Sequence, residues 1–227
     1  MSLKRNIENI SKIVQAARER GGYKQRIEIV AVTKTHPFSV IEKVYKEGLF
    51  SFGENRVQEA ENKFKSFDNL PGINRRFIGH LQSNKVKKCL HLFDTIDSVH
   101  TVKLLKKIST VSKTMGKTTP VLLQVNVSGE PQKNGFLPDQ LEELLFCFEV
   151  ENIKIKGLMA VGPNTKNIDR VRDSFVLLRN LKTTINKHLD KDQINELSMG
   201  MSGDFVTAIE EGSTMIRLGT VLFGNRN

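Results

Sequence analysis

The chain has 227 residues, of which 38% are hydrophobic and 26% are charged. These values are typical of a single globular domain and exclude a disordered or fibrous protein. The first segment is polar and periodic, unlike a signal peptide, and no stretch approaches the roughly 18 apolar residues of a membrane span. We therefore expect a cytoplasmic protein with one domain over residues 1–227 and no membrane partner.

Lysine and arginine outnumber aspartate and glutamate by 35 to 25, which gives a net charge of +10. The basic residues of segments such as 84–88 and 103–107 alternate with apolar positions at helical spacing, which favours solvated helix faces. The chain has no tryptophan, and Tyr23 and Tyr45 are isolated, so few aromatic side chains could stack on RNA bases. We expect no nucleic-acid partner, and we expect a monomer.

An amphipathic helix is predicted at the start of the chain, ending at Gly21-Gly22. From Ile27 onward, short apolar segments rich in β-branched residues alternate with helical patterns. The predicted strands are 27–33, 49–53, 76–80, 95–99, 121–127, 155–161, 196–199 and 215–223. The predicted helices between them are 39–47, 57–67, 83–92, 101–115, 138–150, 169–189 and 204–211.

Alternation of strands and helices along the whole chain predicts parallel βαβ units with helices covering the sheet. About eight such units fit an α/β fold with a single TIM-type (β/α)8 barrel, whereas a doubly wound sheet usually has fewer strands. Such barrels typically take about 250 residues, so this one would be compact.

Polar residues follow several predicted strands, where the active sites of barrels gather. Lys34 comes directly after the first strand. An amine at a barrel mouth loses part of its hydration, which favours the neutral form that a Schiff base requires. The alternative is an ordinary lysine whose stem packs on the strand end while its ammonium stays in water.

A candidate phosphate site follows the seventh and eighth strands. The segment 198–204, which includes Met199 and Ser202, combines small residues with a helix start, where backbone N–H groups can hold a phosphate. Gly219 and Thr220 would supply the second half, since barrels often bind phosphate at these two loops. An ordinary N-cap turn and a packing glycine would explain each piece taken singly.

Other polar residues have both functional and structural interpretations. Arg217 lies inside an apolar strand, so its guanidinium needs a buried partner if it faces the barrel interior. Asn55 and His80 are either ligand contacts or caps of strand ends, and His36 is either beside a cofactor or part of a turn before Pro37.

No metal site is predicted. The five histidines lack metal-ligand spacing, and Cys89 and Cys147 fit neither a metal nor a redox motif. A disulfide between these two cysteines has little support without a secretory signal.

Several runs together resemble the pyridoxal phosphate homeostasis protein family, whose fold is similar to the N-terminal barrel of alanine racemase (fold type III). The runs are VAVTKT at 30–35, FGENRVQE at 52–59, FIGHLQSNK at 77–85, GLM at 157–159, LSMGMS at 197–202 and IRLGTVLFG at 216–224. They occur in the family's order and cover nearly the whole chain.

The resemblance implies that pyridoxal 5′-phosphate (PLP) is held covalently on Lys34. It implies that Ser202, Gly219 and Thr220 bind the phosphate, that Arg217 meets the pyridine nitrogen and keeps it unprotonated, and that Asn55 lies near the ring face. Met199 and His80 complete the candidate cofactor-binding residues.

The sequence departs from the family at one position. Arg75-Arg76 stands where relatives often have Trp-His, so either Arg76 or His80 would have to replace that histidine's contact with the cofactor.

A racemase needs acid or base groups on both faces of the cofactor, commonly a lysine and a tyrosine. Neither tyrosine falls at a strand end. The resemblance likewise implies a protein that carries or buffers PLP, with PLP-dependent apo-enzymes as candidate recipients and no catalytic residue of its own. The alternatives are a slow amino-acid racemase and a Schiff-base aldolase without cofactor, which would be colourless.

Overall fold

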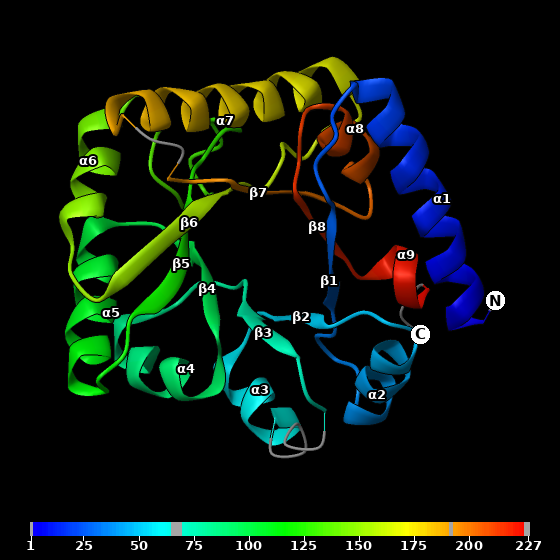
Figure 1. Cartoon of the computed structure of the whole chain (residues 1–227), viewed down its shortest axis with the longest axis horizontal. Coiled ribbons are helices and arrows are strands. Elements are labelled where there is room, and N and C mark those ends of the chain that lie inside the picture. Colours follow the sequence, from blue (N-terminus) through cyan, green and yellow to red (C-terminus); the bar gives the residue numbers. More distant parts are fainter. Residues whose placement is uncertain (1, 65–69, 191–192, 225–227) are drawn as a thin grey trace.

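The structure is a computed structural model that describes residues 2–64, 70–190 and 193–224. Eight parallel strands form a closed barrel in chain order, and β1 pairs with both β2 and β8 (Figure 1). The strands are β1 (Glu28–Val32), β2 (Ser51–Glu54), β3 (Asn74–Phe77), β4 (Thr95–Val99), β5 (Thr119–Gln124), β6 (Ile153–Met159), β7 (Glu196–Met201) and β8 (Met215–Leu218). The predicted (β/α)8 barrel is confirmed.

Helices surround the barrel (Figure 1). The α-helices are α1 (Leu3–Gly21), α2 (Phe38–Lys46), α3 (Val57–Phe64), α4 (Val86–Leu92), α5 (Val102–Thr114), α6 (Leu141–Phe146), α7 (Ile168–His188), α8 (Phe205–Glu210) and α9 (Thr220–Phe223). Short 3-10 helices, η2 (Ser83–Lys85) and η3 (Cys147–Glu149), precede α4 and follow α6.

The first helix begins and ends where the sequence predicts. The Ser2 hydroxyl accepts a hydrogen bond from the Arg5 N–H at 3.4 Å, and Gly22 takes a left-handed conformation with φ 70°. A glycine adopts that conformation without steric cost, which ends the helix cleanly. Ile10 and Ala17 are buried on the face of α1 that packs against α8 and α9.

Strand alternation divides the apolar core into two layers. Val30, Leu122, Met159 and Met215 form the inner cluster along the barrel axis. Strand residues next to these, such as Ile216, belong to a larger cluster that includes buried residues of the helices. Full burial of such a side chain contributes about 1.5–3 kcal/mol to the stability of the fold. A strand rotated to expose its apolar residues would lose this contribution, so burial determines which residues face inward.

The structure corrects the predicted eighth strand. The apolar run 215–223 is a strand only to Leu218, and Thr220–Phe223 forms α9. Gly219 turns the chain between them, with φ −117° and ψ −80°. A short apolar run fits a buried strand and a buried helix equally well, so periodicity alone could not separate the two.

Other boundaries also move. The third and fifth strands begin earlier and end earlier than predicted, and the helix predicted over 138–150 divides into α6 and η3. The helix predicted over 57–67 reaches Phe64, and its remaining positions lie outside the described residues.

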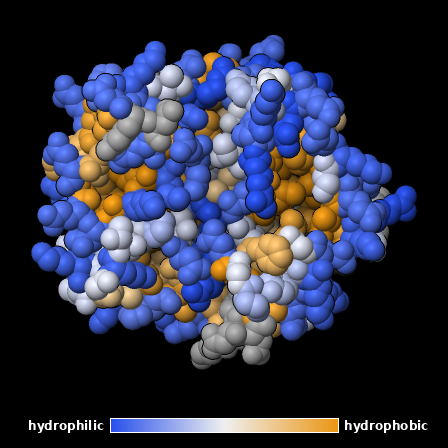
Figure 2. All heavy atoms as spheres, in the orientation of Figure 1, coloured by the Kyte–Doolittle hydropathy of each residue, from blue (hydrophilic) through white to orange (hydrophobic). Residues whose placement is uncertain are grey.

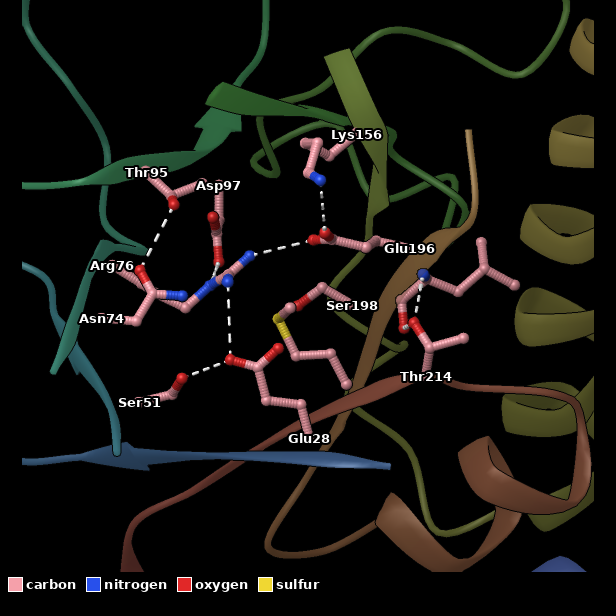
Figure 3. Close-up of polar contacts among 12 residues, drawn as sticks. Glu28, Ser51, Asn74, Arg76, Thr95, Asp97, Lys156, Glu196, Ser198 and Thr214 are labelled. Carbon is pink, nitrogen blue, oxygen red and sulfur yellow. Dashed lines mark hydrogen bonds and ion pairs between the residues drawn. The ribbon is translucent and has the colours of Figure 1, made fainter. Parts of the chain in front are cut away.

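An ionic cluster closes the barrel at the N-terminal ends of the strands (Figure 3). The buried Arg76 guanidinium donates from Nε to Asp97 Oδ2 at 2.8 Å and from Nη2 to Glu196 Oε2 at 3.2 Å, and its Nη1 lies 3.5 Å from Glu28 Oε1. Burial alone would lower the pKa of Arg76, but Asp97 and the two glutamates raise it above its usual value. The cluster therefore holds a charged guanidinium.

The face seen in Figure 2 has a mostly hydrophilic outline, with apolar side chains visible in hollows inside it. No helix among the described residues is long and apolar enough to cross a membrane. Cys89 and Cys147 are both buried and free.

Candidate active-site rim

Lys34 lies in the turn that follows β1, two residues after the last residue of that strand. Thr33 continues the ladder through a 3.2 Å hydrogen bond from its N–H to the Gly53 carbonyl, and its side chain points outward to Glu54. Alternation then directs Lys34 inward, on the same side as Val30 of the inner cluster. The side chain is half-buried, which fits a lysine at a barrel mouth.

The predicted phosphate residues come together beside this strand. The Ser202 hydroxyl accepts a hydrogen bond from the Val221 N–H at 3.3 Å, which joins the loop after β7 to the first turn of α9. A Cβ added at Gly219 would lie 3.6 Å from the Val32 carbonyl oxygen, so this loop runs alongside the end of β1. Ser202, Gly219 and Thr220 therefore share the rim on which Lys34 lies.

Arg217 faces the barrel interior, as one of its two interpretations required. Its Nη1 donates to the Ser198 carbonyl at 2.8 Å and to the Ser198 hydroxyl at 2.7 Å, and its Nη2 donates to the Ala160 carbonyl at 2.8 Å. Its Nε has no hydrogen-bond partner within the described ranges of the chain. Burial lowers the pKa of Arg217, and Asp97 and Asp204 oppose this effect. Because a guanidinium keeps its proton in proteins even when its pKa is lowered, Arg217 remains a charged donor in the barrel.

The structure treats the remaining candidates differently. Asn55 is half-buried after β2, next to Gly79, where an added Cβ would lie only 2.2 Å from the Asn55 carbonyl oxygen. His80 is exposed, and its ring stacks on His100 with centroids 4.6 Å apart. Met199 belongs to the core cluster between sheet and helices, so its side chain is not brought to the rim.

Arg76 and His36 are the last two residues for which the sequence suggested a contact with the cofactor. Arg76, which stands at the histidine position, is bound by acidic groups at the opposite end of the barrel. His36 packs its ring on Phe223 of α9 with centroids 4.5 Å apart, which links the loop after β1 to the loop of the phosphate residues.

Sequence reasoning missed a buried polar network behind Lys34. Lys63 is a buried residue, only 9% exposed, and its ammonium donates to the Thr33 carbonyl at 2.8 Å, to Glu54 Oε1 at 2.8 Å and to Glu59 Oε1 at 2.7 Å. The spacing of Glu59 and Lys63 on a helix signals an ion pair, but it gives no sign of burial.

The pKa values of the two glutamates in this network shift in opposite directions. Burial raises the pKa of Glu54 against the opposing hydrogen bonds from Lys63 and Thr33. Burial would also raise the pKa of Glu59, but hydrogen bonds from Lys63 and the Thr35 N–H lower it overall. The lowered pKa favours the ionised form of Glu59, which is the carboxylate that pairs with the Lys63 ammonium.

Two of the cavities among the described residues are large, and neither is lined by Lys34. One of about 790 Å³ opens at the N-terminal ends of the strands and is lined by residues that include Tyr23, Glu28 and Glu196. The other, of about 550 Å³, borders the predicted phosphate loop and is lined by residues that include Gly203 and Asp204. The larger of these two cavities lies at the N-terminal ends of the strands, whereas the active sites of barrels lie at the C-terminal ends. We therefore place the candidate site at the C-terminal rim.

The donors at this rim match the chemistry of PLP. The half-buried Lys34 supplies a primary amine for an aldehyde. A hydroxyl and the start of a helix supply neutral donors for a phosphate, and Arg217 retains an N–H for a ring nitrogen. The described residues include no group of acidic, histidine or cysteine side chains suited to a metal ion.

A closed barrel of eight parallel strands, with a lysine shortly after β1 and a glycine turn after β8, is typical of the class of alanine racemase-like barrels. The family model of the alanine racemase N-terminal domain matches residues 2–227. The pyridoxal phosphate homeostasis protein of Haemophilus influenzae is 36% identical over 233 aligned residues, covering 100% of this chain and 97% of that protein. The chain belongs to this family, and its full-length relatives are pyridoxal phosphate homeostasis proteins.

Solved structures agree with the fold. PipY of Synechococcus elongatus, without PLP, is 31% identical with a TM-score of 0.89, over 98% of this chain and 100% of that one. The same protein with PLP bound is 30% identical with a TM-score of 0.86, covering 98% of this chain and 100% of that one. Alanine racemase of Clostridium difficile shares only the fold, at 17% identity and a TM-score of 0.73, over 99% of this chain and 56% of the racemase.

Proposed function

We propose that this protein holds PLP covalently on Lys34 and carries or buffers the cofactor, maintaining vitamin B6 and amino-acid balance without catalysis of its own. The observation that carries the proposal is that the loop of Ser202 and Gly219 runs beside Val32 at the end of β1, two residues before Lys34. The PLP-bound PipY structure and the names of the relatives support the same cofactor.

Each residue of the rim has a distinct part in binding. When bound, PLP supplies an aldehyde that condenses with a lysine amine, with loss of one water. Lys34 supplies that amine from rigid backbone at the end of β1. Ser202 and the N–H groups at the start of α9 would bind the phosphate. Arg217 would donate to the pyridine nitrogen and so oppose its protonation, which weakens the ring as an electron sink.

The placement of the tyrosines supports a role without catalysis. The Tyr45 hydroxyl donates to the Pro71 carbonyl at 2.9 Å, and Tyr23 lines the cavity at the N-terminal ends of the strands. Neither of the two tyrosines of this chain faces the rim, so neither can serve as the second acid or base opposite Lys34. We further propose that the protein acts in the cytoplasm as a monomer and passes PLP to apo-enzymes.

The proposal predicts a visible absorption band when PLP is added to the purified apo-protein. Lys34→Ala should abolish the band, while Lys85→Ala, at a lysine of η2, should retain it. Measured on alanine in deuterated water, exchange of the Cα proton should not exceed that of free PLP. A band that survives in Lys34→Ala would contradict the proposed anchor, and steady formation of D-alanine would establish the racemase instead.

A further inference from the structure

The two peptide groups that flank Lys34 are both held by side chains of α3. The carbonyl of Thr33, which precedes Lys34, accepts a hydrogen bond from Lys63 Nζ at 2.8 Å. The N–H of Thr35, which follows Lys34, donates to the carboxylate of Glu59. The backbone of the candidate anchor is thus fixed on both sides by residues that do not enter the barrel.

Lys63 and Glu59 act as one unit. They are four residues apart on α3 and form an ion pair at 2.7 Å. Lys63 also pairs with Glu54 at the end of β2, which is fully buried and accepts from the Thr33 hydroxyl at 2.6 Å. The three acceptors Thr33, Glu54 and Glu59 use all three N–H groups of the ammonium, so its direction is determined.

The backbone at Thr35 explains why such a hold is needed. Thr35 has φ 68°, in the left-handed region that a β-branched residue rarely adopts. Residues stay in this region when surrounding contacts impose it, and such residues gather at functional sites. The hydrogen bond to Glu59 is the contact that acts directly on this peptide group.

A buried ion pair could serve only to dock α3 on the barrel. For docking alone, contacts at any position along β1 or β2 would be sufficient. Here the contacts of the pair with the first strand fall on the residue before Lys34 and the residue after it. The arrangement fits control of the direction of Lys34 better than general docking.

We propose that Lys63 and Glu59 are positioning residues that hold the Lys34 amine in the direction from which it attacks the PLP aldehyde. This inference rests on the proposed function of Lys34. It predicts that loss of the pair slows formation of the Schiff base in protein that remains folded.

The test measures how fast the visible band appears after PLP is mixed with apo-protein, and compares Glu59→Ala and Lys63→Met with wild type. A lysine displaced by about 1 Å can lose up to about a hundredfold in rate, so we expect a slowing of at least about tenfold. Glu59→Gln keeps an acceptor for the Thr35 N–H and should stay nearer to wild type than Glu59→Ala.

A rescue variant separates positioning from stability. Asparagine tolerates the left-handed region better than threonine, so Thr35→Asn should restore part of the rate to Glu59→Ala. Glu211→Ala is a matched control, because it removes ion pairs to Arg172 and Arg179 of α7 at 2.5 Å without contacting β1. Circular dichroism of every variant gives the folded fraction by which its rate is corrected.

The outcomes are distinct. Slow rates in Glu59→Ala and Lys63→Met, rescue by Thr35→Asn and a normal rate in Glu211→Ala would support the inference. Normal corrected rates in both α3 variants would overturn it while leaving Lys34 as the anchor. Absence of any Schiff base on Lys34 in wild type would instead contradict the proposed function itself.

Discussion

At the scale of single residues, Lys34 takes its direction from Thr33. The side chain of Thr33 is bound on the outer side of the barrel by Glu54, and alternation then sends Lys34 inward. The sequence predicted Lys34 and Ser202 because each follows a predicted strand, and it predicted Gly219 because barrels often bind phosphate near their seventh and eighth strands. Met199 could not be placed in this way, since a shift of one residue along β7 decides which side its chain faces.

Lys63 shows a second limit at this scale. A charged residue on a helix is expected to face water, and nothing in its own segment indicates that three acceptors surround it. Its partners come from β1, β2 and α3, so the network is visible only after the chain is folded. Sequence patterns of a single segment cannot reveal it.

Arg217→Gln tests how the buried guanidinium affects the cofactor. The variant keeps a side chain that can reach Ser198 but removes the positive charge beside a ring nitrogen. We expect PLP to bind on Lys34 with an altered visible band across pH 6–9, and a loss of stability of about 1–3 kcal/mol from unpaired carbonyls. Lys156→Met, at the other end of the barrel, is the control. An unchanged spectrum in Arg217→Gln would exclude the expected contact.

At the scale of elements, α9 is the part that the sequence described wrongly. The run after Gly219 contains Val221, Leu222 and Phe223, which suit a strand by composition. The structure bends the chain at Gly219 and begins a helix there, whose Val221 N–H donates to the Ser202 hydroxyl. The candidate phosphate residues stay a prediction, but the secondary structure that holds them differs from the one expected.

Ser202→Ala tests this loop. Removal of the hydroxyl takes away the acceptor of the Val221 N–H and one neutral donor for phosphate. We expect the affinity for PLP to fall by roughly tenfold, which corresponds to about 1.4 kcal/mol, with little effect on the affinity for pyridoxal, which lacks the phosphate. Equilibrium titration of the visible band with both compounds measures the two affinities. An equal loss for both would show that Ser202 does not act on the phosphate.

At the scale of the whole molecule, the barrel could be predicted because eight strand–helix alternations leave few other topologies. The ends of the barrel then take separate tasks. An ionic cluster of Arg76, Asp97, Glu28 and Glu196 occupies one end (Figure 3). The candidate site lies at the other end. The departure from the family at position 76 therefore concerns the interior near the N-terminal ends of the strands.

Arg76→Met should destabilise the whole barrel. It leaves Asp97 buried without its ion-pair partner, and breaking one partner of a buried pair costs about 3–5 kcal/mol. Urea unfolding at pH 7 measures the loss. The double variant Arg76→Met with Asp97→Leu should be more stable than Arg76→Met alone, because it also removes the buried, unpaired carboxylate of Asp97. A single variant as stable as wild type would show that the cluster does not stabilise the barrel.

The most direct test of the central claim is the location of the covalent adduct. Protein loaded with PLP is reduced with borohydride, digested, and analysed by peptide mass. The account predicts one modified peptide, with the reduced pyridoxyl group on Lys34. A reduced group on another lysine, or no adduct after incubation with PLP, would contradict it.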